Sequence, residues 1–250
     1  EAKVMAEAGA RQYLCPGVGG WNQWMNLVEN SYKNITRMCG YARKYQAEGI
    51  LNTDWGDCGH INQPDFSLPG LIYGAVFSWG EDADSFEKLN EQISRLAYGD
   101  RSGKFVSYMA KTAECSIFDW WDANVVYEEK VLGHPNNRNA LFDTRIQDEK
   151  KRAAVHETLA SLKKELKKTA REMEESCRYL VSTLELTMDA IDIWNETGAR
   201  LCDIEYGKEK DEAACAALAG RLEAWFMKYK ASWRSISKEG DLHHIAEIVF

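Results

Sequence analysis

Two short apolar segments, each followed by a polar loop that contains tryptophan, constrain the fold of this chain most strongly. Residues 11–15 (RQYLC) predict a strand that stops at Pro16, and residues 48–57 (EGILNTDWGD) predict a second strand. Between them, from residue 24 to about residue 46, apolar side chains recur at helical intervals of three and four residues. Residues 71–80 (LIYGAVFSWG) predict the start of another helix. This order gives two βα units, which implies parallel strands and a layered α/β architecture.

Beyond residue 84 the strand signal disappears and helical patterns replace it. Ser85 is a predicted N-cap for a helix that runs to Tyr98, where Gly99 and Asp100 break the pattern. Further helical patterns cover residues 103–132, 211–235 and 241 onward.

The longest helical pattern runs from residue 144 to residue 204. Its large apolar residues mostly lie three, four or seven positions apart, which predicts a seam for helix packing. The seam consists of Leu159, Leu162, Leu166, Met173, Cys177, Leu180, Leu184, Ile191 and Trp194. We therefore expect a mostly α chain, with an α/β part at residues 1–83 and an all-α helical bundle domain at residues 84–250.

Composition and charge narrow the classes of partner. A hydrophobic content of 45% in 250 residues is enough for a real core. The net charge of -8, without a basic stripe, argues against nucleic acid or an anionic membrane and favours a neutral ligand. No apolar run is long enough to span a membrane. The seven cysteines show neither disulfide nor zinc spacing, so we expect reduced thiols in a cytoplasmic protein, with no metal and no cofactor.

The two strand-end loops contain the candidate site. Loops after the carboxyl ends of parallel strands converge on one face, where α/β proteins place their ligands. A tryptophan ring presents a flat apolar surface that can cover the C–H face of a sugar, while nearby carboxylates bond its hydroxyls. The TDWGD segment fits this chemistry. Two structural readings compete, because Trp55 also fits a core anchor and Asp54 or Asp57 a cap of the next turn.

Three segments resemble the last two βα units of glycoside hydrolase family 20, the β-N-acetylhexosaminidase family. They are YLCPGVGGWNQW (residues 13–24), GILNTDWGDCGH (residues 49–60) and SLPGLIYGAVFSW (residues 67–79). The similarity is greatest to the bacterial exo-β-N-acetylglucosaminidase branch, in which a helical domain follows the (β/α)8 barrel. The resemblance covers roughly residues 10–80 and extends more loosely through the helical part.

The resemblance implies roles for particular residues. In that family the eighth strand ends in a Trp-Gly-acidic motif, whose indole walls the N-acetylhexosamine site and whose carboxylate holds sugar hydroxyls far from the anomeric carbon. These positions correspond to Trp55 and Asp57, with Trp21 in the preceding loop as a further wall. Asp54 and His60 receive no family role, and a histidine such as His60 is more typical of a loop-orienting hydrogen-bond group than of a catalyst.

The resemblance also implies that the catalytic pair lies outside this chain. In the family the substrate's acetamide attacks the anomeric carbon, assisted by an adjacent Asp-Glu pair after the fourth strand. No such pair follows either predicted strand here, since Glu81-Asp82 comes after a helical pattern. Both chain ends read as cuts within helices, so we expect the C-terminal part of a longer enzyme that is inactive alone.

Two βα units cannot close a barrel, and their strands would leave pairing edges open. We therefore expect this part of the chain to associate with the missing barrel portion or with a second copy.

A non-catalytic alternative remains open from the sequence. The helical seam and its tryptophans would serve a partner helix in an assembly module, although each of these residues also fits the chain's own core. The tryptophans concerned are Trp120, Trp121, Trp194, Trp225 and Trp233. A saccharide-binding protein should respond to N-acetylglucosamine, whereas an assembly module should not.

Overall fold

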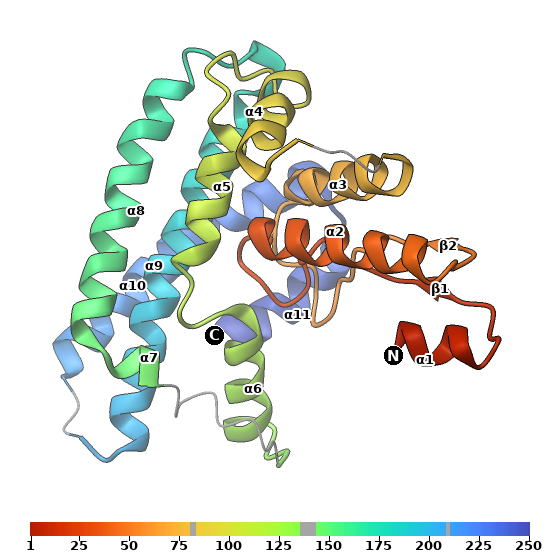
Figure 1. Cartoon of the computed structure of the whole chain (residues 1–250). Helices are drawn as coiled ribbons and strands as arrows, with labels where there is room; N and C mark the ends of the chain where they lie inside the picture. Colours follow the sequence, from red (N-terminus) through yellow and green to blue (C-terminus); the bar gives the residue numbers. More distant parts are fainter. Residues whose placement is uncertain (81–83, 136–143, 209–210) are drawn as a thin grey trace.

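The computed structural model describes residues 1–80, 84–135, 144–208 and 211–250, and within them the chain is mostly α-helical, as predicted (Figure 1). The first part contains α1 (Ala2–Glu7), β1 (Tyr13–Leu14), α2 (Val28–Lys44), β2 (Gly49–Ile50), the 3-10 turn η1 (Pro64–Ser67) and α3 (Leu68–Trp79). The second part contains α4 (Phe86–Leu96), α5 (Phe105–Glu114), α6 (Trp120–Lys130), α7 (Thr144–Gln147), α8 (Glu149–Thr169), η3 (Glu175–Cys177), α9 (Tyr179–Glu205), α10 (Glu212–Ile236) and α11 (Glu239–Val249).

The predicted parallel pairing is confirmed. Strands β1 and β2 are parallel, with Tyr13 opposite Gly49, and a further parallel bridge joins Gly17 to Thr53. Helix α2 forms the connection between the strands, and α3 packs against α2 (Figure 1). In the described residues the parallel sheet has these two strands.

Helix α2 begins later than the sequence predicts. The helical spacing starts at Trp24, but the helix starts at Val28, and Trp24 and Met25 lie buried in the loop before it. The backbone explains the difference, because Leu27 N donates to Gly19 O across 3.0 Å and closes the loop just before the first turn. Gly19 has a φ of 70°, which favours glycine.

The predicted helix at residues 103–132 is interrupted, and the structure shows α5 and α6 instead. Asn195 of α9 accounts for the break. Its buried amide oxygen accepts from Ile117 N at 2.8 Å and Phe118 N at 3.0 Å, and its Nδ2 donates to Cys115 O at 2.9 Å. These bonds satisfy backbone groups that a continuous helix would pair internally. Asp119 then caps α6 in a capping box with Asp122.

The long pattern from residue 144 to residue 204 also folds as separate helices, of which α8 and α9 are the longest and pack side by side (Figure 1). A bridge between Asp100 and Met173 and the bond from Glu174 N to Gly99 O hold the intervening turn against the end of α4. The predicted seam is buried, except that Cys177 is only partly so. Ser85 caps α4 by accepting from Lys88 N, as predicted.

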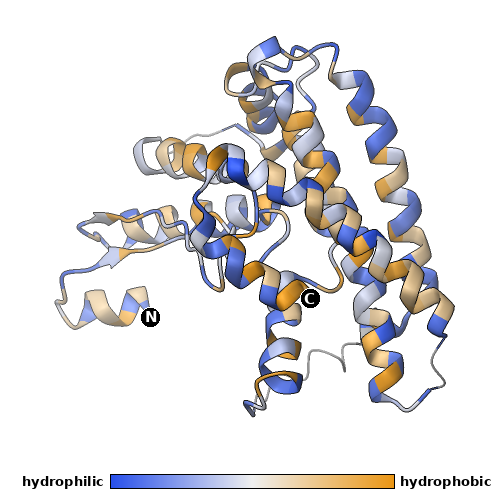
Figure 2. Cartoon of the chain, turned by 180° about the vertical axis from the view of Figure 1, so that it is seen from behind, coloured by the Kyte–Doolittle hydropathy of each residue, from blue (hydrophilic) through white to orange (hydrophobic). Residues whose placement is uncertain are grey.

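The hydrophobic core is one continuous cluster that includes residues from both predicted parts. Trp24 lies within it, with ring centroids 5.2 Å from Trp120, 5.3 Å from Trp194 and 5.8 Å from Trp225. Apolar and hydrophilic residues alternate along the packed helices, as expected of amphipathic segments (Figure 2). The division at residues 83 and 84 remains a prediction.

We expect Asn195→Ala to lower the free energy of unfolding by about 2 to 4 kcal/mol, because two buried N–H groups and a carbonyl would lose their partner. Urea denaturation followed by circular dichroism measures this change. Asn30→Ala on the exposed side of α2 is the matched control and should change stability little. Equal effects of the two substitutions would contradict the role given to Asn195.

Candidate functional site

The candidate site lies where the loops after the two strands meet. These are the β1 loop (residues 15–27) and the β2 loop (residues 51–63). The loops are joined at their base by the parallel ladder and farther out by Asn62 Nδ2, which donates to Gly20 O at 2.7 Å. Both loops therefore leave the same end of the sheet, as expected for parallel strands.

The structure places the predicted site residues in these loops. Trp55 is 55% exposed and Asp57 is also exposed, two and four residues beyond Thr53 in the ladder. Trp21 is half-buried, and its ring lies so close to Gly17 that a Cβ there would be 2.6 Å from the indole. An indole and a carboxylate thus face solvent after β2, and the β1 loop holds a second, half-buried indole against Gly17.

The structure contradicts one of the two competing structural readings of the motif. The exposure of Trp55 excludes a core anchor. Neither Asp54 nor Asp57 caps η1, which begins at Pro64 and has Gln63 at its N-cap position. A turn lies at residues 57 and 58, and the capping of this turn stays a prediction.

Asp54 and His60 form an ion pair across the β2 loop. Their Oδ1 and Nε2 atoms are 3.5 Å apart, and the side chains retain 26% and 23% exposure. His60 Nδ1 lies 3.3 Å from Asn62 O, so the ring is held on both sides. Both atoms of the pair lie close to Gly20, where a Cβ would be 2.9 Å from Asp54 Oδ1 and 3.2 Å from His60 Nε2. His60 thus orients the loop, in agreement with the sequence-based expectation.

The pair shifts the pKa values of both groups. Burial raises the pKa of Asp54, but hydrogen bonds from His60 and Ser67 and the charge of His60 outweigh burial, so this pKa is lowered. Burial lowers the pKa of His60, but the hydrogen bond and charge of Asp54 outweigh it, so this pKa is raised above 6.5. Each group therefore favours the charged form of the other.

Helices from the second part hold the β2 loop in place. Trp120 Nε1 of α6 donates to Cys58 O at 2.9 Å, and Tyr229 of α10 donates through its hydroxyl to Ile61 O at 2.8 Å. The sequence pattern indicated only that Trp120 suits a core. Its role as a donor to the loop depends on contacts between distant segments that a helical spacing does not reveal.

A cleft of about 370 Å³ adjoins the pair, between the β2 loop and the turn from α10 to α11. It is lined by Asp54, His60, Pro64, Trp233, Ser237, Lys238, Gly240 and Asp241. Two carboxylates, an imidazole and an ammonium group therefore surround it.

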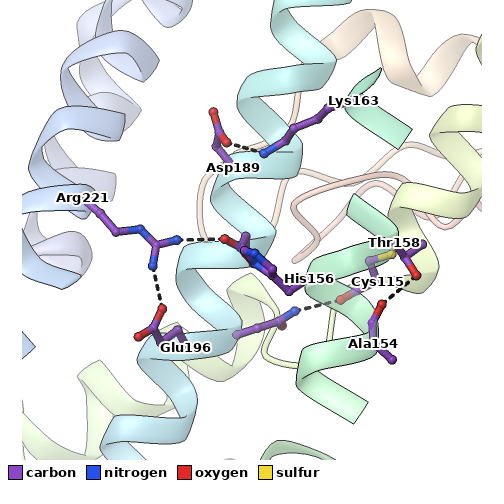
Figure 3. Close-up of polar contacts among 10 residues, drawn as sticks. Cys115, Ala154, His156, Thr158, Lys163, Asp189, Glu196 and Arg221 are labelled. Carbon is purple, nitrogen blue, oxygen red and sulfur yellow. Dashed lines mark hydrogen bonds and ion pairs between the residues drawn. The ribbon is translucent and has the colours of Figure 1, made fainter. Parts of the chain in front are cut away.

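A second polar cluster joins helices α8, α9 and α10. Asp192 accepts from His156 Nδ1 at 2.7 Å and from Arg221 Nη2 at 2.8 Å, while Arg221 Nη1 donates to Glu196 at 2.6 Å. Figure 3 shows Arg221 reaching across to Glu196, with His156 on the neighbouring helix. The cluster satisfies its own charges and holds three helices together, so we assign it a structural role.

Some features lie outside the candidate site. Glu81 and Asp82 fall outside the described residues. Within the described ranges, no group of three or more His, Cys, Asp or Glu side chains is arranged to hold a metal ion. None of the helices in that part of the chain is both long and apolar enough to cross a membrane.

No protein-family model, curated protein or solved structure matches the chain. Function is therefore inferred from the residues and their geometry.

We expect the Asp54–His60 pair to stabilise the fold by up to about 1 kcal/mol in a limited pH window. The contribution of His60 is fully present below pH 6.5 and is lost as pH rises through its raised pKa. The contribution of Asp54 is present above pH 3.8 and is lost as pH falls through its lowered pKa. The difference in unfolding free energy between the wild type and Asp54→Asn should thus be greatest between pH 3.8 and pH 6.5 and smaller at alkaline pH. Urea denaturation across this range measures it, and a constant difference would contradict the pairing.

Proposed function

We propose that this chain is the C-terminal part of a β-N-acetylhexosaminidase-like glycoside hydrolase of family 20, which removes terminal β-linked N-acetylhexosamine from glycans. The chain would supply the distal wall of the sugar pocket and a supporting helical domain. The observation that carries the proposal is the exposed placement of Trp55 and Asp57 at the carboxyl end of a parallel βα pair.

The chemistry of these side chains suits a neutral sugar. The exposed indole of Trp55 offers a flat apolar surface for sugar C–H groups, and Asp57 can accept hydrogen bonds from hydroxyls. Trp21 would close the pocket from the β1 loop. The resemblance gives all three residues a role in binding and orientation.

The reaction would follow the substrate-assisted route. The acetamide oxygen forms a bond to the anomeric carbon as the glycosidic C–O bond breaks, and a carboxylic acid protonates the leaving oxygen. Water then displaces the acetamide oxygen and restores the sugar with retained configuration. The Asp-Glu pair for these steps would come from the preceding part of the enzyme.

Among the described residues β2 pairs with β1 alone, which supports association with further barrel strands or with a second copy. A groove of about 660 Å³ runs between β2, α2 and α3, and its lining includes Gly49, Ile50 and Asn52 of the strand region. Leu51 is 58% exposed and Trp79 is 93% exposed in the same part of the chain. An unpaired strand edge with exposed apolar side chains favours pairing with another strand.

The assembly alternative has less support. Trp120, Trp194, Trp225 and Trp233 are at most 7% exposed and pack in the chain's own core, so they are not available to a partner helix. Trp121 is partly buried.

We expect N-acetylglucosamine to bind this chain weakly and Trp55→Ala to reduce the affinity at least about fivefold, because the stacking surface is lost. NMR titration of indole N–H signals detects binding in the millimolar range. Trp79→Ala removes another exposed indole, on α3, and should leave the affinity unchanged. A sugar response unaffected by Trp55→Ala would place the binding elsewhere.

We expect Asp57→Ala in the longer enzyme to lower kcat/KM for an aryl β-N-acetylglucosaminide about 10- to 150-fold, since losing bonds to a charged group costs about 1.5 to 3 kcal/mol. The 250-residue chain alone should be inactive. Glu157→Gln on the exposed face of α8 serves as the control and should retain activity. An inert longer enzyme, or full activity in Asp57→Ala, would argue against the proposal.

A further inference from the structure

The Asp54–His60 pair encloses the segment that contains the two proposed sugar-binding side chains. Trp55 and Asp57 lie between its members in the sequence. The chain reverses at Cys58 and Gly59, which have φ values of 56° and 74°, and this reversal brings His60 back to Asp54.

Each end of the enclosed segment is fixed by a different part of the molecule. On one side Thr53 is held in the ladder, where its N donates to Pro16 O at 2.8 Å. On the other side Cys58 O accepts from Trp120 Nε1 at 2.9 Å. Between these anchors Trp55 and Asp57 face solvent, so their positions depend on the local geometry of the loop, to which the ion pair contributes directly.

We propose that the Asp54–His60 pair positions Trp55 and Asp57 for the sugar, and that loss of the imidazole proton loosens the segment and weakens sugar binding. This inference rests on the proposed saccharide site and adds a proton-dependent control of its affinity. Asp54 and His60 act through the loop and are positioning residues.

The β1 loop packs closely against the Asp54–His60 pair at Gly20. An added Cβ at Gly20 would approach Asp54 Oδ1 and His60 Nε2, and would also lie 2.8 Å from Asn26 Nδ2. Asn26 is itself buried and donates to Ser67 Oγ at 3.1 Å. The β1 loop thus presents backbone and a neutral amide to the pair.

The charges that face the pair come from the other side of the cleft. Asp241 of α11 and Lys238 of the preceding turn line it together with Asp54 and His60. The remaining lining residues are uncharged. At mildly acidic pH the site holds two carboxylates, one ammonium and one imidazolium. Deprotonation of His60 leaves an excess of negative charge next to Asp54, which weakens the contact that closes the loop.

The direction of the pH effect follows from these groups. The contact between Asp54 and His60 raises the pKa of His60, so the charged pair persists above pH 6.5 and is lost at higher pH. We expect the affinity for N-acetylglucosamine to fall about fivefold between mildly acidic and alkaline pH, the factor that corresponds to one partly exposed ion pair.

The test is an NMR titration of the 250-residue chain with N-acetylglucosamine at a series of pH values, recording the His60 ring signals and the Trp55 indole signal in the same samples. In the wild type the Trp55 signal should move with the His60 titration, both with and without sugar. Asp54→Asn should lower the pKa of His60 and remove the pH dependence of affinity. His60→Gln, which keeps a neutral hydrogen-bond donor, should also make the affinity independent of pH. The control is His243→Gln on α11, which should retain the wild-type profile.

Failure of this inference and failure of the proposed function give different results. Sugar binding that is reduced by Trp55→Ala but keeps its pH profile in Asp54→Asn and His60→Gln would overturn the inference and leave the function intact. A Trp55 signal that follows the His60 titration without any response to sugar would support the positioning role and overturn the saccharide function. If a variant does not fold, the wild type still decides the question. A Trp55 signal that does not move with the His60 titration in the wild type overturns the inference.

Discussion

The packing of Trp24 is the interaction on which the rest of the structure depends. Its indole belongs to the β1 loop, yet it lies within 5.8 Å, centroid to centroid, of tryptophans from α6, α9 and α10. Aromatic rings of this size bury a large apolar area, and their preferred ring arrangements orient the elements that they join. The contact fastens the βα pair to the helices. Those helices in turn hold the β2 loop through Trp120 and Tyr229.

The loop that contains the exposed motif is therefore anchored to distant parts of the chain. Cys58 and Ile61 are bonded to side chains from the helical part, and Asn62 joins the two loops. A binding surface benefits from such support, because side chains that are already ordered lose less entropy when a ligand binds. The helical part thus supports the candidate site, whereas Trp55 and Asp57 themselves belong to the β2 loop.

Local chemistry made much of the fold predictable. The strands, the parallel pairing and the cap at Ser85 follow from signals within a few residues, and Trp55 and Asp57 could be placed because loops follow strand ends. The break before α6 could not be predicted, since it depends on Asn195, far along the chain. The Asp54–His60 contact was equally hidden, because it requires the reversal at residues 58 and 59. The spacing of apolar residues predicted a helix start at Trp24, which is wrong. A buried loop and the buried face of a helix both favour large apolar residues, so the spacing does not distinguish them.

The position of Trp24 also has a consequence for biosynthesis. Its partners include Trp225, so the chain must be synthesised at least as far as α10 before the cluster can close. Contacts between segments this distant form slowly, because the intervening chain must first be brought together. Until then the first βα unit would expose its indole and its strand edges. The docking of α10 is therefore the step that completes the cluster around Trp24.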